Sequence, residues 1–113
     1  MKEKGTIIGK KVTVIMDRPM GTYHPKHKDM FYPVNYGYIP GIIAGDGEEQ
    51  DAYVLGMDEP LQEFTGVVIA IIHRQDDVEE KWVVAPEDIK LTKEEIWEQV
   101  KFQEQYFKSS VQI

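Results

Sequence analysis

The segment Asp46-Gly-Glu-Glu-Gln-Asp51 places four carboxylates within six positions of the chain. Like charges this close repel one another, and a folded protein tolerates them mainly when water or a hard cation lies among them. Oxygen ligands with no cysteine nearby suit Mg²⁺, Mn²⁺ or Ca²⁺ rather than zinc. The segment therefore predicts a divalent-metal site, and phosphate chemistry is the reaction class that we expect there.

The residues before this acidic segment determine its backbone conformation. They read Tyr32-Pro-Val-Asn-Tyr-Gly-Tyr-Ile-Pro40, and residues 32–47 hold two prolines and four glycines in sixteen positions. Prolines and glycines at this density exclude a regular helix and favour short extended pieces joined by turns. Asp46-Gly47 is also an ordinary turn dipeptide, so a solvated loop is the competing interpretation when the carboxylates are taken by themselves.

Composition and charge narrow the classes of function. The 113 residues predict a single domain, 1–113, of ordinary soluble composition. The longest apolar run, Val67–Ile72, is far short of the ~20 residues that cross a bilayer, so we expect no membrane contact. The net charge of −7 argues against a nucleic-acid partner, and it would repel an anionic substrate unless a bound metal reversed the local sign. With no cysteine and no apolar leader, a cytoplasmic location is expected.

Hydrophobic patterns predict several short strands followed by one helix. We expect a loop at residues 17–29 and strands at residues 6–16, 52–56, 65–74 and 81–85. Thr92-Lys-Glu-Glu95 is a capping box that opens a helix running to about Ser109, and the apolar side of this helix should dock on the sheet. The predicted fold class is α+β, with a small, mostly antiparallel β-barrel and a C-terminal α-helix packed on it.

The tyrosine-rich segment closely resembles a motif of the soluble inorganic pyrophosphatases of family I, the β-barrel type, which reads Tyr-Pro-x-Asn-Tyr-Gly-Tyr-Ile. That family continues with Asp-Gly-Asp-Pro-x-Asp, and residues 46–51 stand at the same spacing. Weaker matches are Met16-Asp17-Arg18, Lys81-Trp-Val-Val-Ala-Pro86 and Phe102-Gln-Glu-Gln-Tyr106. The resemblance implies an OB-like five-stranded barrel that hydrolyses pyrophosphate, or a closely related phosphoanhydride, with Mg²⁺.

The resemblance also implies roles for individual residues. Glu48 stands where the family has the aspartate that binds metal and activates the attacking water, and Tyr36 matches a tyrosine beside that water. The other implied metal ligands are Asp46, Asp51, Glu79 and either Asp76 or Asp77. The implied phosphate-binding residues are Arg18 and Lys81, which would act in catalysis, and Tyr106 and Lys108. Mg²⁺ is the implied cofactor, Mn²⁺ could replace it, and a homo-oligomer is the implied assembly.

Departures from the family pattern keep other functions open. Glutamate replaces aspartate at Glu48 and Glu79, and the family's early acidic and lysine side chains have no counterpart. An insertion at residues 23–29 carries His24 and His27, which belong either to a solvated loop or, with neighbouring lysines, to an anion-binding patch. The alternative function is a non-catalytic metal- and phosphate-binding or sensing module on the same barrel, and a structural subunit is a third hypothesis.

Overall fold

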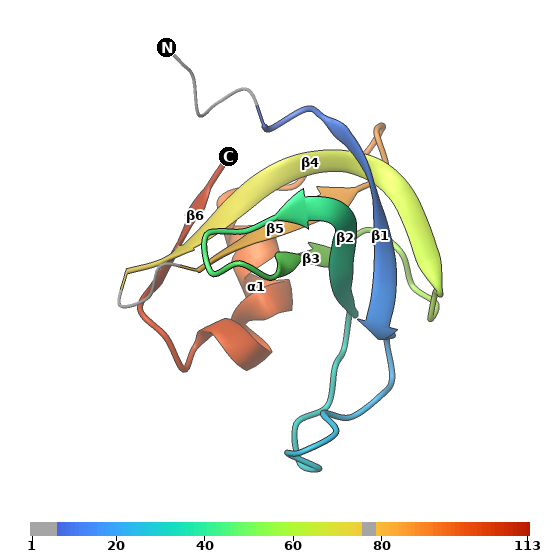
Figure 1. The fold of residues 1–113 in the computed structure, drawn as a ribbon, viewed down its shortest axis with the longest axis vertical. Coiled ribbons are helices and arrows are strands. Elements are labelled where there is room, and N and C mark those ends of the chain that lie inside the picture. Colours follow the sequence, from blue (N-terminus) through green and yellow to red (C-terminus); the bar gives the residue numbers. More distant parts are fainter. Residues whose placement is uncertain (1–6, 76–78) are drawn as a thin grey trace.

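The computed structural model describes residues 7–75 and 79–113, and within them the chain forms six strands and one α-helix (Figure 1). The elements in chain order are β1 (Lys11–Arg18), β2 (Asn35–Ile43), β3 (Glu49–Val54), β4 (Glu63–Arg74), β5 (Glu80–Ala85), α1 (Lys93–Glu104) and β6 (Ser109–Gln112). In this described part, no helix has the length and apolar character to span a membrane. Asp76 and Asp77, and the first residue of the predicted N-terminal strand, lie outside the described ranges.

Five of the strands close into a barrel. β1 pairs antiparallel with both β2 and β4, β2 pairs antiparallel with β3, and β4 pairs antiparallel with β5. β3 and β5 run parallel and complete the ring. This arrangement confirms the predicted α+β fold with a small OB-like barrel, in which all the ring pairings but one are antiparallel.

Strand β4 is the longest strand and has three neighbours. Its residues 63–67 pair with β1, its residues 71–74 pair with β6, and β5 lies along its other side. A shift of register between Val68 and Ala70 marks a bulge that bends the strand, and Figure 1 shows β4 as a long arc. The short β6 therefore extends the sheet beyond the barrel and does not belong to the ring.

Alternation along the strands sorts the buried side chains into two clusters. In β3, Ala52 and Val54 belong to the first cluster, which fills the barrel, whereas Tyr53 belongs to the second. Ile96 and Val100 of α1 also belong to the second cluster. The second cluster therefore lies between the barrel and α1, and it fixes the helix on one outer face of the sheet.

The helix begins where the sequence predicts it. Thr92 Oγ1 accepts a hydrogen bond from the Glu95 N–H at 3.1 Å, and Glu95 Oε1 accepts one from the Thr92 N–H at 2.9 Å. This is the predicted capping box, and it satisfies two backbone donors that would otherwise lack partners. Ile96, Val100 and Glu104 are the buried residues of α1, and their spacing of four places them on one face.

The predicted end of the helix near Ser109 is wrong. α1 ends at Glu104, and Ser109–Gln112 form β6 against β4. The Phe107 N–H bonds to the Glu104 carbonyl oxygen at 3.0 Å, which turns the chain out of the helix. The physical reason is the edge of β4, which offers backbone partners to residues 109–112 that a helix would leave unpaired.

The strand boundaries differ from those expected, most of all in β1 and β3. The predicted strand at residues 6–16 is displaced, because β1 begins only after a turn at Gly9, whose φ of +102° favours glycine, and it continues to Arg18. Asp17 and Arg18 are therefore strand residues and not loop residues. β3 begins inside the acidic segment, at Glu49. Arg18 therefore pairs with Tyr36 of β2, and Glu49 pairs with Ile43 of β2.

Candidate active site

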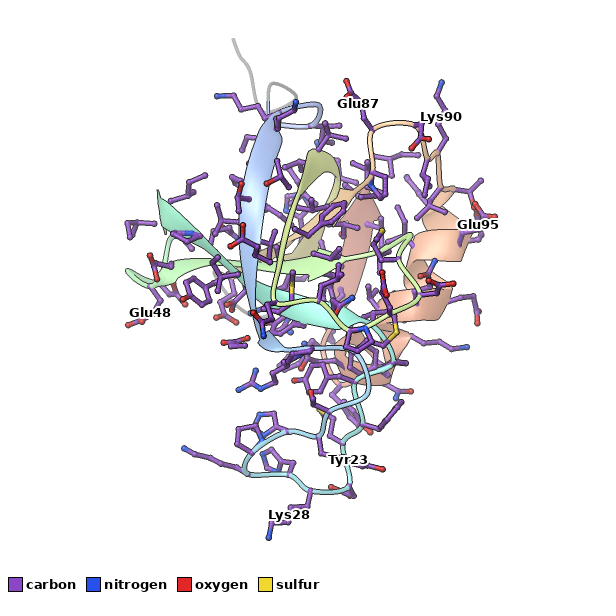
Figure 2. The ribbon with its side chains drawn as sticks, turned by 90° about the vertical axis from the view of Figure 1, so that its right-hand side faces the viewer. Tyr23, Lys28, Glu48, Glu87, Lys90 and Glu95 are labelled. Atoms are coloured by element: carbon purple, nitrogen blue, oxygen red, sulfur yellow. The ribbon has the colours of Figure 1, made fainter. Side chains whose placement is uncertain are left out.

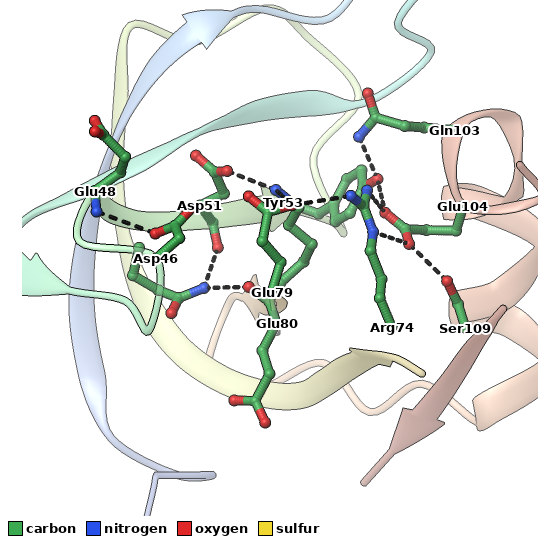
Figure 3. Close-up of polar contacts among 12 residues, drawn as sticks. Asp46, Glu48, Asp51, Tyr53, Arg74, Glu79, Glu80, Gln103, Glu104 and Ser109 are labelled. Atoms are coloured by element: carbon green, nitrogen blue, oxygen red, sulfur yellow. Dashed lines mark hydrogen bonds and ion pairs between the residues drawn. The ribbon is translucent and has the colours of Figure 1, made fainter. Parts of the chain in front are cut away.

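The acidic segment forms the tip of the β2–β3 hairpin. The Gly47 N–H bonds to the Ala44 carbonyl oxygen at 3.0 Å, and the φ of Gly47, +86°, favours glycine. Asp46 Oδ1 accepts a hydrogen bond from the Glu48 N–H at 3.0 Å, so the turn itself orients Asp46. Glu48 is exposed, and Figure 3 shows its carboxylate directed away from Asp46.

Asp51 and Lys81 meet because β3 and β5 are parallel neighbours. Ala52 lies opposite Trp82 in the register, which places the preceding residues of the two strands side by side. Lys81 Nζ lies 2.6 Å from Asp51 Oδ2 and 3.5 Å from Glu79 Oε1, and only 5% of the Lys81 side chain is exposed. A buried ammonium group requires such partners. The fold thus brings together three predicted site residues, Asp51, Glu79 and Lys81.

The side chain of Glu79, just before β5, acts on the charge of Asp46 at the hairpin tip. The N–H of Glu48 and, after it, a hydrogen bond from the Glu79 side chain lower the pKa of Asp46, because both stabilise its charged form. A hydrogen bond between two carboxyl groups needs a proton between them, and a divalent cation can replace that proton. The contact between Asp46 and Glu79 is therefore a place where the residues fit a cation.

Asp17 is a further carboxylate of the site, and the family resemblance does not imply a role for it. Desolvation raises the pKa of Asp17 against the opposing charge of Arg18, and the negative charge of Asp51 raises it further. The end of β1 thus places Asp17 within electrostatic reach of Asp51 and Lys81. The sequence signal for Asp17 is its place in the Asp-Arg pair at that strand end.

The carboxylates do not yet form a complete metal centre. Within residues 7–75 and 79–113, no group of three or more acidic or histidine side chains is close enough to hold a metal ion. The donor set nevertheless fits Mg²⁺ or Mn²⁺, because it consists of carboxylate oxygens. Of its members, Asp51 and Glu79 contact Lys81, and Asp17 and Asp46 lie within electrostatic reach of it.

Two aromatic rings lie beside the cations of the site. Lys81 Nζ is 5.9 Å from the centroid of the Tyr36 ring, and the Arg18 guanidinium carbon is 5.7 Å from the centroid of the Tyr32 ring. Burial, and after it the negative charge of Asp51, raises the pKa of Tyr36. The Tyr36 hydroxyl therefore stays protonated, so it can donate a hydrogen bond but cannot act as a base.

A buried ion pair between Arg74 and Glu104 adjoins the site and is absent from the sequence prediction. Glu104 is fully buried and accepts hydrogen bonds from Arg74 Nε at 3.0 Å, Arg74 Nη2 at 2.7 Å, the Tyr53 hydroxyl at 2.7 Å and the Ser109 hydroxyl at 2.9 Å. Arg74 Nη1 also donates a hydrogen bond to Glu79 Oε1 at 3.1 Å (Figure 3). Arg74 therefore links α1 to the carboxylates of the site.

The titration of the buried Glu104 carboxylate should make the free energy of unfolding depend on pH. Burial raises its pKa, but hydrogen bonds from Arg74 and Tyr53 outweigh burial, so the pKa of Glu104 lies below its usual 4.5. The stabilisation is complete above about pH 5 and is lost as the pH falls through the lowered pKa. We expect the free energy of unfolding, measured in urea, to fall more steeply between about pH 6 and about pH 3 in the wild type than in Glu104→Gln. Equal slopes would contradict this account.

A cavity of about 330 Å³ opens beside Lys81, the cation that contacts the carboxylates Asp51 and Glu79. The lining residues that matter here are His24, His27, Tyr36, Arg74, Lys81 and Tyr106. Three predicted site residues thus face one cavity, and the two histidines of the insertion belong to its wall. Lys108 is exposed in the turn before β6 and does not line this cavity. Its binding role stays a prediction, as does the metal role of Asp76.

The chain matches known proteins over most of its length. A family model described as inorganic pyrophosphatase matches residues 7–110. The inorganic pyrophosphatase of Pseudomonas aeruginosa is 33% identical over 82 residues, which are 66% of this chain and 42% of that protein. Inorganic pyrophosphatase 1 of Pseudomonas syringae is 38% identical over 69 residues, which are 57% of this chain and 34% of that protein. The chain thus spans less than half the length of the curated relatives that it matches.

Solved structures share the fold. The inorganic pyrophosphatase of Ehrlichia chaffeensis superposes with a TM-score of 0.69 at 18% identity, and the match covers 93% of this chain and 86% of that one. The inorganic pyrophosphatase of Helicobacter pylori superposes with a TM-score of 0.63 at 19% identity, covering 91% and 81%. At these identities the likeness establishes the barrel and its helix.

Proposed function

The chain belongs to the inorganic pyrophosphatase family, and from this premise we propose that it is an enzyme that hydrolyses pyrophosphate to two phosphates with Mg²⁺. The observation that carries the proposal is the contact of Lys81 with Asp51 at 2.6 Å, next to the Asp46–Glu79 pair. The Lys81 ammonium group can bind phosphate oxygens, and the carboxylates beside it can bind a divalent metal.

The carboxylates supply the metal-binding part of the proposal. Asp46, Asp51 and Glu79 would hold Mg²⁺, or Mn²⁺ in its place, and Asp17 would contribute a further carboxylate after a local movement of the side chains. A divalent metal bound there would neutralise substrate oxygens and lower the pKa of a bound water. The raised pKa of Asp17 supports this assignment, because the repulsion that causes part of the rise is what a cation would relieve.

The remaining side chains supply substrate binding and proton transfer. Lys81 and Arg18 would hold the phosphate oxygens, and arginine's planar fork suits two of them. Tyr36 would donate a hydrogen bond from its protonated hydroxyl, and Tyr106, which lines the same cavity, would contact the substrate. Glu48 would accept the proton of the attacking water, which requires its side chain to turn inward from the position in Figure 3.

A non-catalytic sensing module is the second candidate, and the position of Glu48 favours it. A carboxylate that faces away from Asp46 cannot accept a proton at the metal without moving, whereas binding of metal and phosphate needs no such acceptor. The two candidates share the cavity and the metal ligands, so they differ in turnover alone.

Phosphate release from pyrophosphate, with Mg²⁺ or Mn²⁺ and then with excess chelator, tests the proposal. We expect release that requires the metal and that Asp51→Asn and Glu48→Gln each lower by at least about 100-fold. Asp58→Asn, which changes an exposed aspartate on the β3–β4 loop, is the control and should keep the wild-type rate. Metal-dependent binding without release would support the sensing module, and neither binding nor release would leave a structural subunit.

A further inference from the structure

The cavity beside Lys81 adjoins a second one. This neighbour, of about 250 Å³, is lined by Asp29, Phe31, Phe102 and Gln105, and it shares Met30 and Tyr106 with the first cavity. Together the two cavities form a cleft between the loop that joins β1 to β2 and the C-terminal end of α1. Figure 2 shows this loop, marked by Tyr23 and Lys28, projecting beyond the end of the barrel.

One end of the cleft is suited to phosphate. Arg74 and Lys81 line it, and only 5% of each side chain is exposed, so both cations are held in place. His24 Nδ1 accepts hydrogen bonds from the N–H groups of Lys26 at 3.0 Å and His27 at 3.2 Å. Because Nδ1 is an acceptor, the neutral ring carries its proton on Nε2, which leaves a hydrogen-bond donor for an anion.

The other end of the cleft is suited to a flat apolar group. In the described part of the chain, six large hydrophobic side chains are exposed. Three of them, Phe31, Tyr106 and Phe107, line this cleft, and a fourth, Tyr23, packs against Phe31 at its edge. All four are aromatic. Tyr106 is 68% exposed and Phe31 is 45% exposed, so both side chains present aromatic surface to a ligand. Such a concentration of exposed aromatic surface marks a binding groove.

We propose that this cleft binds a phosphoanhydride that carries a flat aromatic group, with a nucleoside diphosphate as the simplest example. The inference rests on the proposed function and names the substrate class of the same site. The first cavity alone lies within the range of about 300–1,000 Å³ that holds small organic ligands. The diphosphate would lie at Lys81 and Arg74, and the base would stack on Tyr106 and Phe31.

The reaction is the same anhydride cleavage. The water oxygen bonds to the terminal phosphorus, and the bridging P–O bond breaks. Its electron pair leaves with the nucleoside monophosphate, inorganic phosphate is the second product, and the proton of the water is released. No co-reactant other than water is required.

Comparing ADP with methyl diphosphate tests the proposal, because the two carry the same diphosphate and differ in the base and sugar. We expect the KM for ADP to be at least about 10-fold lower than that for methyl diphosphate, as one base–aromatic stack would give. Phe31→Ala should raise the KM for ADP by about the same factor and leave the kinetics with methyl diphosphate and pyrophosphate unchanged. Phe31→Tyr, which keeps the ring, should restore the low KM.

Ile43→Ala is the matched control, because Ile43 is 63% exposed on β2 and does not line the cleft. Equal KM values for ADP and methyl diphosphate, or a loss in Phe31→Ala that is the same for all three substrates, would overturn the proposal. If no substrate is turned over, the proposed hydrolysis fails. The binding affinities of ADP and methyl diphosphate, measured by calorimetry in the presence of Mg²⁺, then test this inference separately. Tighter binding of ADP that Phe31→Ala weakens would support it, and equal binding of the two ligands would refute it.

Discussion

Replacing Lys81 with methionine is expected to lower kcat/KM for pyrophosphate by about 10²–10³-fold while the chain stays folded. The Lys81 ammonium is the cation that contacts both Asp51 and Glu79 and also lines the cavity. Methionine keeps most of the side-chain volume and removes the charge that would stabilise the transferring phosphoryl group. Asp51 keeps contact with water, with 35% of its side chain exposed, so it tolerates the loss of its partner.

Steady-state phosphate release measures this effect, and circular dichroism checks the fold. Lys11→Met is the matched control, because Lys11 is exposed at the opposite end of β1 from Arg18. Lys81→Arg should recover only part of the rate, since a planar guanidinium does not reproduce the point charge of an ammonium group. Wild-type kinetics in Lys81→Met would remove Lys81 from the site.

Replacing Glu104 with glutamine is expected to lower the free energy of unfolding by about 3–5 kcal/mol, the usual cost of breaking a buried ion pair from one side. Glu104 is fully buried, and its carboxylate accepts the four hydrogen bonds that hold Arg74, Tyr53 and Ser109. The neutral amide leaves the buried guanidinium without its main counter-charge. Urea denaturation at neutral pH measures the loss.

A double replacement separates the ion pair from simple packing. Arg74→Met combined with Glu104→Leu removes both charges, so it should recover much of the stability that Glu104→Gln loses. Glu98→Gln is the control on the same helix: Glu98 pairs with Lys101 at 2.8 Å, but 66% of its side chain is exposed, so a change below about 0.5 kcal/mol is expected. A loss in Glu98→Gln as large as that in Glu104→Gln would contradict the assignment.

The start of the helix is predictable from the sequence and its end is not, because the two depend on contacts of different range. Thr92 and Glu95 cap the helix within four residues, so the local sequence contains the whole signal. The end depends on β6, which pairs with β4 through contacts such as His73 with Gln112, 39 residues apart. No local pattern reports such a pairing, and a short polar segment at a sheet edge has weak strand character of its own.

In the site, too, the features that depend on local sequence are predictable, and those that depend on distant contacts are not. The acidic hairpin is visible from its composition, and the family resemblance adds Lys81 from a strand that is distant in the chain. Arg74 is missed because its position depends on Glu104, 30 residues away, and on the burial of that helix face. The spacing of Glu104 four residues after Val100 is the one signal that could have identified it.

The parallel pairing of β3 with β5 has a consequence for the order in which the molecule matures. Asp51 and Lys81 are separated by 30 residues and become neighbours only after the chain has crossed over through β4. Loops of this length close slowly, whereas a capped helix nucleates from contacts within a few residues. During refolding, the helical circular-dichroism signal in the far ultraviolet should therefore return before the chain can bind its ligand. The reactive centre is thus expected to form late in folding.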